Sequence, residues 1–289
     1  MVAAVWGSTV VVMKSAFETL PALTVVSIRL MLTALALLLA FPRLLRMTRA
    51  EATPGIGLGL LLAAGLVTQT LGLTLIAPST SGFLTATYVV FTALITAVVL
   101  KHRQPVTIWL AVAATVAGVT VLASGHGGES ADLVGGTALT LLSAVIYAVH
   151  IVVLSRVARP ATAARITLLQ ALTGGAVGVA LWPFVGEAPP PDPVLWAQLG
   201  YLGIVCGALA LLLQSWAQSH LAAIPAAIIM CSEPVWAAAL SVGFGFETFT
   251  AAMVIGGSLV VGALLLTVIG PRSDPERSEA LAHSPQEVL

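Results

Sequence analysis

The sequence has little charge and almost no cysteine. Only 8% of its 289 residues are charged, against about a quarter in an average soluble domain, and the formal net charge is zero. So few charges cannot cover a globule in water, and a nucleic-acid partner is excluded because it requires a basic face. Cys206 and Cys231 lie in apolar runs without metal-ligand spacing, so neither a metal nor a cofactor is expected.

The chain contains long apolar runs instead, with 58% hydrophobic residues and a mean hydropathy of +1.05. A helix that crosses the hydrocarbon core needs about 20 mostly apolar residues. Ten runs fit or approach this length, and prolines and glycines separate most of them: Val2–Ala16, Thr24–Phe41, Gly55–Ile76, Gly82–Leu100, Thr107–Ser124, Leu133–Leu154, Thr162–Val185, Trp196–Gln218, Pro225–Phe246 and Ala251–Ile269. The sequence therefore predicts an all-α membrane protein of ten transmembrane helices. A cleavable signal peptide is the competing interpretation of the first run, but no basic segment precedes it.

The distribution of positive charge predicts the orientation, because Lys and Arg accumulate on cytoplasmic loops. With the N-terminus in the cytoplasm and ten spans, the outer loops contain no Lys or Arg. The cytoplasmic segments then contain Arg43, Arg46, Arg49, Lys101, Arg103, Arg156, Arg159, Arg165, Arg272 and Arg277. Both termini are therefore expected in the cytoplasm, with residues 271–289 as a polar, disordered tail.

An internal repeat is visible at a shift of 141 to 145 residues. At a shift of 145, Ala77–Leu94 falls on Ala222–Ala239, so that Val90-Phe91-Thr92-Ala93 meets Val235-Trp236-Ala237-Ala238. Single residues also pair, the one from the first half being named first: Trp6 and Tyr147, Thr9 and His150, Arg29 and Gln170, Gln69 and Gln214, Tyr88 and Glu233. The predicted units are residues 1–125 and 131–270, with five helices each. Because five is odd, the second unit enters the membrane from the opposite side, which gives an inverted repeat.

Several motifs resemble the drug/metabolite transporter superfamily, specifically its EamA-like family. They are Trp6-Gly7-Ser8-Thr9, Leu20-Pro21 followed by Arg29, the segment Ser79–Phe91, and Glu233-Pro234-Val235-Trp236-Ala237-Ala238. The resemblance covers residues 1–270. It implies two five-helix repeats, a central cavity, and transport or export of small organic solutes. One departure is Lys101-His102-Arg103, which stands where the family pattern has Gly-Glu-Arg.

Glu233 is the one acidic residue within a predicted span, and it is the candidate for proton coupling. An ionised carboxylate there costs about 2.5–3.5 kcal/mol on insertion scales, so a proton, a cation or water must offset that cost. Pro234 removes a backbone donor from the carbonyl of Met230 and leaves an acceptor nearby. The alternative is a structural carboxyl that bonds to hydroxyls such as those of Ser232 or Ser241.

Two cations also lie within predicted spans, Lys14 and Arg29. Glu18 follows Lys14 by four residues and is positioned to pair with it. For Arg29 the preferred interpretation is that the side chain extends to the headgroups, as long cationic stems do near helix ends. If either cation faces a cavity, it suits a carboxylate or phosphate of the substrate.

The other candidate substrate-binding residues are aromatic, amide, hydroxyl and imidazole side chains in apolar helices. Aromatic rings suit stacking, although they more often pack or lie at the membrane interface. Amides often bond one helix to another, and a neutral histidine is more often a hydrogen-bonding partner than a proton relay with Glu233. Together with Lys14, the predicted substrate-binding set is Trp6, Ser8, Gln69, Tyr88, His150, Gln214 and Trp236.

These patterns favour a secondary transporter over an enzyme, a channel or a scaffold. The sequence has no G-x-x-x-x-G-K-[ST] motif for ATP hydrolysis, and one lone carboxylate is too few for intramembrane catalysis. Channels usually have rings of charged residues or a selectivity filter, and the sequence shows neither. We expect an exporter of a neutral, zwitterionic or amphipathic metabolite such as an amino acid, acting as a monomer or homodimer in a bacterial inner membrane. The sequence does not identify the substrate or the direction of transport.

Overall fold

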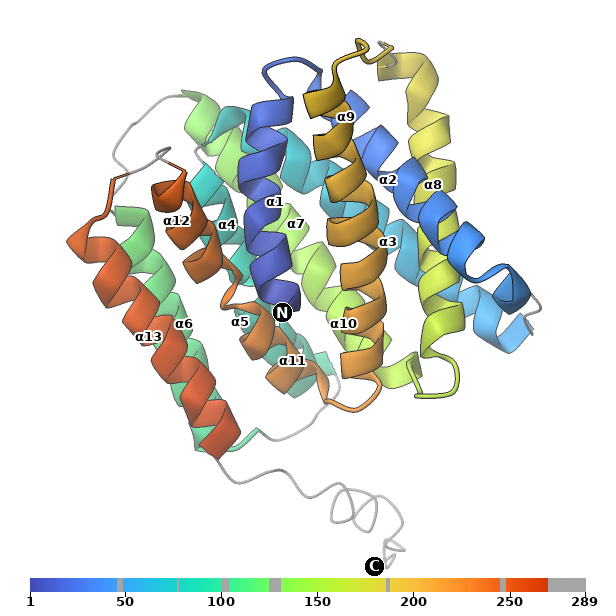
Figure 1. Cartoon of the computed structure of the whole chain (residues 1–289). Coiled ribbons are helices and arrows are strands. Elements are labelled where there is room, and N and C mark those ends of the chain that lie inside the picture. Colours follow the sequence, from blue (N-terminus) through green and yellow to red (C-terminus); the bar gives the residue numbers. More distant parts are fainter. Residues whose placement is uncertain are drawn as a thin grey trace, which may run out of the picture.

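A computed structural model describes residues 1–45, 49–76, 78–99, 104–124, 131–185, 188–244 and 248–269. All regular structure in these ranges is helical (Figure 1). The first half contains α1 (Val2–Ala16), α2 (Ala22–Ala40), the 3₁₀ turn η1 (Pro42–Leu45), α3 (Arg49–Leu75), α4 (Pro78–Ala86), α5 (Tyr88–Leu94), the π-helical η2 (Ile95–Val99) and α6 (Val106–Ser124). The second half contains α7 (Ala131–Val157), α8 (Ala163–Val185), α9 (Pro193–Gly200), the π-helical η3 (Tyr201–Leu209), α10 (Ala210–Gln218), α11 (Ala223–Met230), α12 (Glu233–Gly243) and α13 (Ala251–Ile269).

Seven helices of the described chain are long and apolar enough to cross a membrane. They are Ala22–Ala40, Ala52–Leu75, Ser81–Val99, Val134–Val157, Ala163–Phe184, Pro193–Gln218 and Ala223–Gly243. Three further apolar helices are shorter: Val2–Ala16, Val106–Gly118 and Ala251–Ala263. Large apolar side chains also cover much of the outside, among them Leu39 at 72%, Val98 at 70% and Phe184 at 84% exposure. An apolar outer surface is stable in lipid, which covers it in place of water.

The helices pack in pairs that combine one element from each half of the chain. Helix α6 packs along α13 at one side of the bundle, α2 packs along α8 and η3, α3 along α7, and α1 against α12 (Figure 1). By the repeat shift, α1 corresponds to α7, α2 to α8 and α6 to α13. The pairs α2–α8 and α6–α13 therefore each join an element to its own counterpart.

Two spans are interrupted at matching positions. The helix α4 ends at Ala86 and α5 begins at Tyr88, while α11 ends at Met230 and α12 begins at Glu233. The Thr87 amide donates to Leu84 O at 3.2 Å and the Ser232 amide to Ile229 O at 3.3 Å, so a tighter turn replaces the helical bond at each break. The two breaks touch, because Cys231 Sγ donates to Ala86 O at 3.0 Å.

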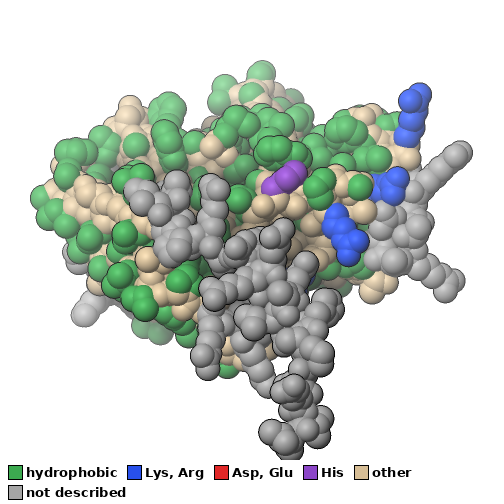
Figure 2. All heavy atoms as spheres, turned by 90° about the horizontal axis from the view of Figure 1, so that it is seen from below, with side chains coloured by type: hydrophobic (Ala, Val, Ile, Leu, Met, Phe, Trp, Pro, Cys, Tyr) green, Lys and Arg blue, Asp and Glu red, His purple; other side chains and the backbone are tan. Residues whose placement is uncertain are grey.

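Apart from Lys14, Arg29 and Glu233, which lie within apolar helices, the described charges that Figures 1 and 2 place lie at the two ends of the bundle. Arg43 lies in η1, and Arg156, Arg159 and Arg165 lie at the junction of α7 and α8, on the face where α13 ends. Viewed onto this face, Figure 2 shows Lys and Arg side chains gathered at one side and no coloured acidic group. Glu18 follows α1 and Asp192 precedes α9 at the opposite end. The tail 271–289 and the segment Lys101-His102-Arg103 lie outside the described residues.

Candidate substrate pocket between the two repeats

A pocket opens in the middle of the bundle, lined by α1, α2, α3 and the broken span α4–α5 of the first half and by α7, α8, η3, α10 and the broken span α11–α12 of the second. Helices α6 and α13 do not contribute to its described lining. All ten residues of the five repeat-related pairs line it: Trp6, Tyr147, Thr9, His150, Arg29, Gln170, Gln69, Gln214, Tyr88 and Glu233. Positions that correspond between the halves therefore converge on one site.

Glu233 is the first residue of α12, immediately after the helix break, and it is 8% exposed. Its carboxylate lies in the first turn of a helix, where the helix dipole favours negative charge. No hydrogen bond to this carboxylate occurs in the described part of the chain, and Ser232 Oγ donates to Ile229 O instead. The structural alternative that paired Glu233 with the Ser232 hydroxyl is therefore not the arrangement found.

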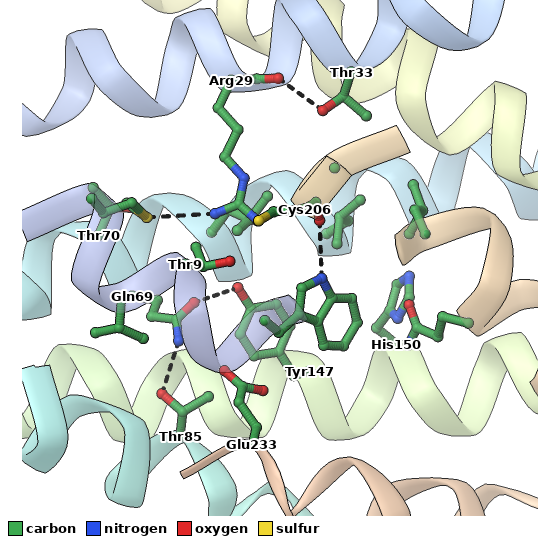
Figure 3. Close-up of a pocket in the computed structure, with 18 of the residues that line it drawn as sticks. Thr9, Arg29, Thr33, Gln69, Thr70, Thr85, Tyr147, His150, Cys206 and Glu233 are labelled. Carbon is green, nitrogen blue, oxygen red and sulfur yellow. Dashed lines mark hydrogen bonds between the residues drawn. The ribbon is translucent and has the colours of Figure 1, made fainter. Parts of the chain in front are cut away.

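Arg29 lines the same pocket, which corrects the expectation that it extends to the headgroups. Its side chain is only 5% exposed, and Nη1 donates to Met13 Sδ at 3.4 Å. The physical reason is the position of Arg29 on the face of α2 that is turned toward α1 and the pocket. Figure 3 shows the guanidinium entering from one side and the Glu233 carboxylate from the opposite side, with Gln69 and Tyr147 between them.

A chain of hydrogen bonds connects three helices along one wall of the pocket. Tyr147 OH on α7 donates to Gln69 Oε1 on α3 at 2.9 Å, and Gln69 Nε2 donates to Thr85 Oγ1 on α4 at 3.1 Å (Figure 3). Gln69 is thus both a helix-to-helix connector and a pocket residue. Its counterpart Gln214 is buried, and Gln214 Oε1 has no partner within the described residues.

Two further contacts fix side chains at the pocket. Trp6 Nε1 donates to Cys206 O at 3.0 Å, a carbonyl within the π-helical segment η3 (Figure 3). His150 Nε2 and Gln170 Oε1 are 2.7 Å apart and both residues are buried. This agrees with the interpretation of His150 as a hydrogen-bonding partner, and it leaves Gln170 Nε2 unpartnered in the described structure.

Three residues of the predicted substrate-binding set are not part of the described pocket lining. Ser8 Oγ lies 2.7 Å from Tyr201 OH, and Lys14 Nζ donates to Leu73 O at 3.4 Å rather than pairing with Glu18. Trp236 was expected to face the cavity, but it is 48% exposed and does not line the pocket. Glu233 lines the pocket at the start of α12, whereas the Trp236 Cβ, three residues further along, faces Gly7 of α1 and much of its ring is exposed.

Sequence reasoning did not select Thr9, Thr33, Thr85, Tyr147 or Gln170 as site residues, although three of them belong to repeat-related pairs. The repeat itself was the signal that could have identified Thr9, Tyr147 and Gln170. No group of three or more His, Cys, Asp or Glu side chains that could hold a metal occurs among the described residues.

A model of the EamA-like transporter family matches residues 1–124 and again residues 134–269. The chain belongs to the EamA-like transporter family. It is accordingly a multi-pass membrane protein with two copies of the family's repeat, and the family is one of membrane transporters. A solved structure described as "Crystal structure of protein" is similar, with a TM-score of 0.75 and 20% sequence identity over 92% of this chain and 93% of that chain, which supports the fold. A search of curated proteins found no match.

Proposed function

We propose that this EamA-like protein is a secondary transporter that exports small organic metabolites, such as amino acids or related compounds, by alternating access. One observation carries the proposal: corresponding residues of both repeats meet in a single pocket that holds buried polar groups inside an apolar bundle. Substrate sites of transporters built from repeats lie in this position, between the repeats and near broken helices.

The proposed arrangement is ten spans in two inverted repeats, with both termini in the cytoplasm of a bacterial inner-membrane protein. The seven long and three shorter apolar helices, and the basic face at the end of α13, support it. An Arg156→Cys variant tests the orientation, because both native cysteines are buried. We expect an impermeant maleimide to label Arg156→Cys only in opened cells. Labelling in intact cells would contradict the orientation.

We further propose that Glu233 exchanges a proton for the substrate, because its buried carboxylate has no hydrogen-bonding or ion-pair partner among the described residues and must be neutralised by something mobile. The titratable or charged groups around it are Arg29 on α2, Tyr88 on α5, Tyr147 and His150 on α7, and Cys231 before α12. Acidification on one side of the membrane is then expected to drive substrate out from the other side.

Flux into proteoliposomes tests the function. A carrier gives saturable flux, a channel gives flux that does not saturate, and a scaffold gives none. For an exchange of one proton, a gradient of one pH unit should support about tenfold accumulation, the equivalent of about 1.4 kcal/mol. Glu233→Gln should lose this response, whereas the control Glu18→Gln, outside the pocket, should keep it. A Glu233→Gln protein with unchanged flux and unchanged response would remove the carboxyl from the coupling mechanism.

A further inference from the structure

The pocket lining contains one arginine and one glutamate among its described residues, and they come from different repeats. Arg29 lies on α2 in the first half and Glu233 begins α12 in the second. Their counterparts are uncharged, since Gln170 corresponds to Arg29 and Tyr88 corresponds to Glu233. A duplicated motif would give the same charge twice. The pocket therefore has one positive and one negative group at positions that the repeat does not duplicate.

Neither charge is neutralised by another residue in the described part of the chain. No N···O distance of 4.0 Å or less joins Arg29 to Glu233 or to another carboxylate in the described ranges. The one hydrogen bond of the guanidinium goes to the thioether of Met13, which is a weak acceptor. The carboxylate of Glu233 has no hydrogen bond at all in this part of the chain. Both groups are more than nine-tenths buried and both point into the pocket (Figure 3).

Unpaired buried charges are costly, and the cost is removed when a ligand supplies the opposite charges in the right order. A guanidinium binds a carboxylate through two parallel hydrogen bonds, and a carboxylate binds an ammonium. A purely cationic ligand would leave Arg29 unpaired, and a purely anionic one would leave Glu233 unpaired. A zwitterion satisfies both at once.

The rest of the lining indicates what such a ligand carries besides its charges. Met13, Leu62, Leu66, Leu73 and Leu211 all contribute apolar surface to the pocket. Burial of an aliphatic side chain against such surface is favourable because it removes apolar area from water.

We propose that the pocket selects zwitterions with an apolar side chain, holding the ligand carboxylate at Arg29 and the ligand ammonium at Glu233. This inference rests on the proposed transport function and names its substrate class. The ammonium pairs with the ionised form of Glu233, so its arrival displaces the proton of the exchange proposed above. Arg29 and Glu233 act here as two separate recognition points, one for each end of the ligand.

A matched ligand series tests the proposal on the purified full-length protein. The ligands are L-leucine, 3-methylbutylamine, which lacks the carboxylate, and 4-methylpentanoate, which lacks the ammonium. Affinity is measured as the concentration that gives half-maximal thermal stabilisation. We expect L-leucine to bind at least about tenfold more tightly than either analogue, because each charged hydrogen-bonding partner is worth about a factor of ten or more.

Two variants separate the recognition points. Arg29→Gln should weaken L-leucine and 4-methylpentanoate by about tenfold or more and leave 3-methylbutylamine unchanged. Glu233→Gln should weaken L-leucine and 3-methylbutylamine and leave 4-methylpentanoate unchanged. A variant that merely misfolds cannot give this crossed pattern, because each must retain one ligand. The controls Arg43→Gln and Glu18→Gln change charges outside the pocket and should retain all three affinities.

Three results would overturn the proposal: equal binding of the three ligands by the unaltered protein, an equal loss of all three in both variants, or no binding of L-leucine. The first and third need no variant and stand even if Arg29→Gln does not fold. Saturable flux of metabolites without preference for zwitterions would reject this inference and leave the proposed function in place. Absence of saturable flux for every metabolite offered would reject both.

Discussion

Gly7 lies where α1 closely approaches the backbone of α12, and its replacement by alanine is a direct test of how Glu233 is positioned. A Cβ atom at Gly7 would lie 2.8 Å from Glu233 O, 2.8 Å from Trp236 Cβ and 2.9 Å from Ala237 N. Two of these neighbours are backbone atoms, which cannot move away by changing a rotamer. The added methyl group must therefore push the two helices apart.

The size of this effect follows from the contact distances. Ordinary van der Waals contact begins at 3.4 Å, so α1 and α12 must separate by about 0.6 Å at Gly7. Overpacking against backbone atoms falls in the upper part of the usual range, about 2–3 kcal/mol, and the better helix propensity of alanine returns about 1 kcal/mol. We therefore expect a net loss of about 1–2 kcal/mol. At about 2–4 °C per kcal/mol, the Tm falls by about 2–8 °C.

The assay compares Gly7→Ala with Gly57→Ala in thermal unfolding and in proteoliposome flux. Gly57 is the matched control, because a Cβ there meets nothing within 4 Å. Gly57→Ala should keep or slightly raise the Tm and leave flux unchanged. Gly7→Ala should lower both the Tm and the flux, since the displaced residue is Glu233 itself. If both variants have the Tm and flux of the unaltered protein, the close approach of α1 to α12 does not position the carboxylate.

Two smaller changes should also be measurable. Trp6→Phe replaces the indole by a smaller aromatic ring that has no donor to Cys206 O, and it should lower the stability by about 1 kcal/mol or more, measured as a Tm decrease. An unchanged Tm would show that this bond adds nothing. Tyr147→Phe removes the donor to Gln69 and should lower the stability by about 0.6 kcal/mol, the average for hydrogen bonds between membrane helices. A double-mutant cycle with Gln69→Leu should give a coupling energy of this size, and additive effects of the two changes would contradict the predicted coupling.

The sequence predicted the helical class, and its repeat indicated residues that line the pocket, whereas the direction of several individual side chains was not predicted. The five single-residue pairs found by the repeat shift line the pocket, because residues at corresponding positions of two related halves lie around a shared centre. The paired runs 90–93 and 235–238 are not part of the described lining. The carboxylate of Glu233 was also predicted to be inside the membrane region, since no other acidic residue interrupts an apolar run. These inferences depend on order along the chain, which a sequence shows directly.

The direction of Arg29 and of Trp236 could not be predicted, because the helices that carry them are apolar on all sides. In a soluble helix a polar stripe marks the outer face, whereas in lipid the outer face is as apolar as the core. The break at Thr87 had no signal either, since no proline lies within the span. In contrast, Pro234 correctly indicated a local loss of backbone bonding, and the structure has α12 beginning one residue before it.

The contact between Cys231 and Ala86 brings the two helix breaks to one point at the level of the pocket. Each interrupted span therefore consists of two shorter helices, and the helices of both spans meet near this contact. If the helices of a span tilt about this contact, one end of the span moves away from its neighbours while the other end moves toward them. If the protein transports as proposed, access from both sides at once would require the two breaks to separate, and the hydrogen bond from Cys231 to Ala86 is one of the contacts that holds them together.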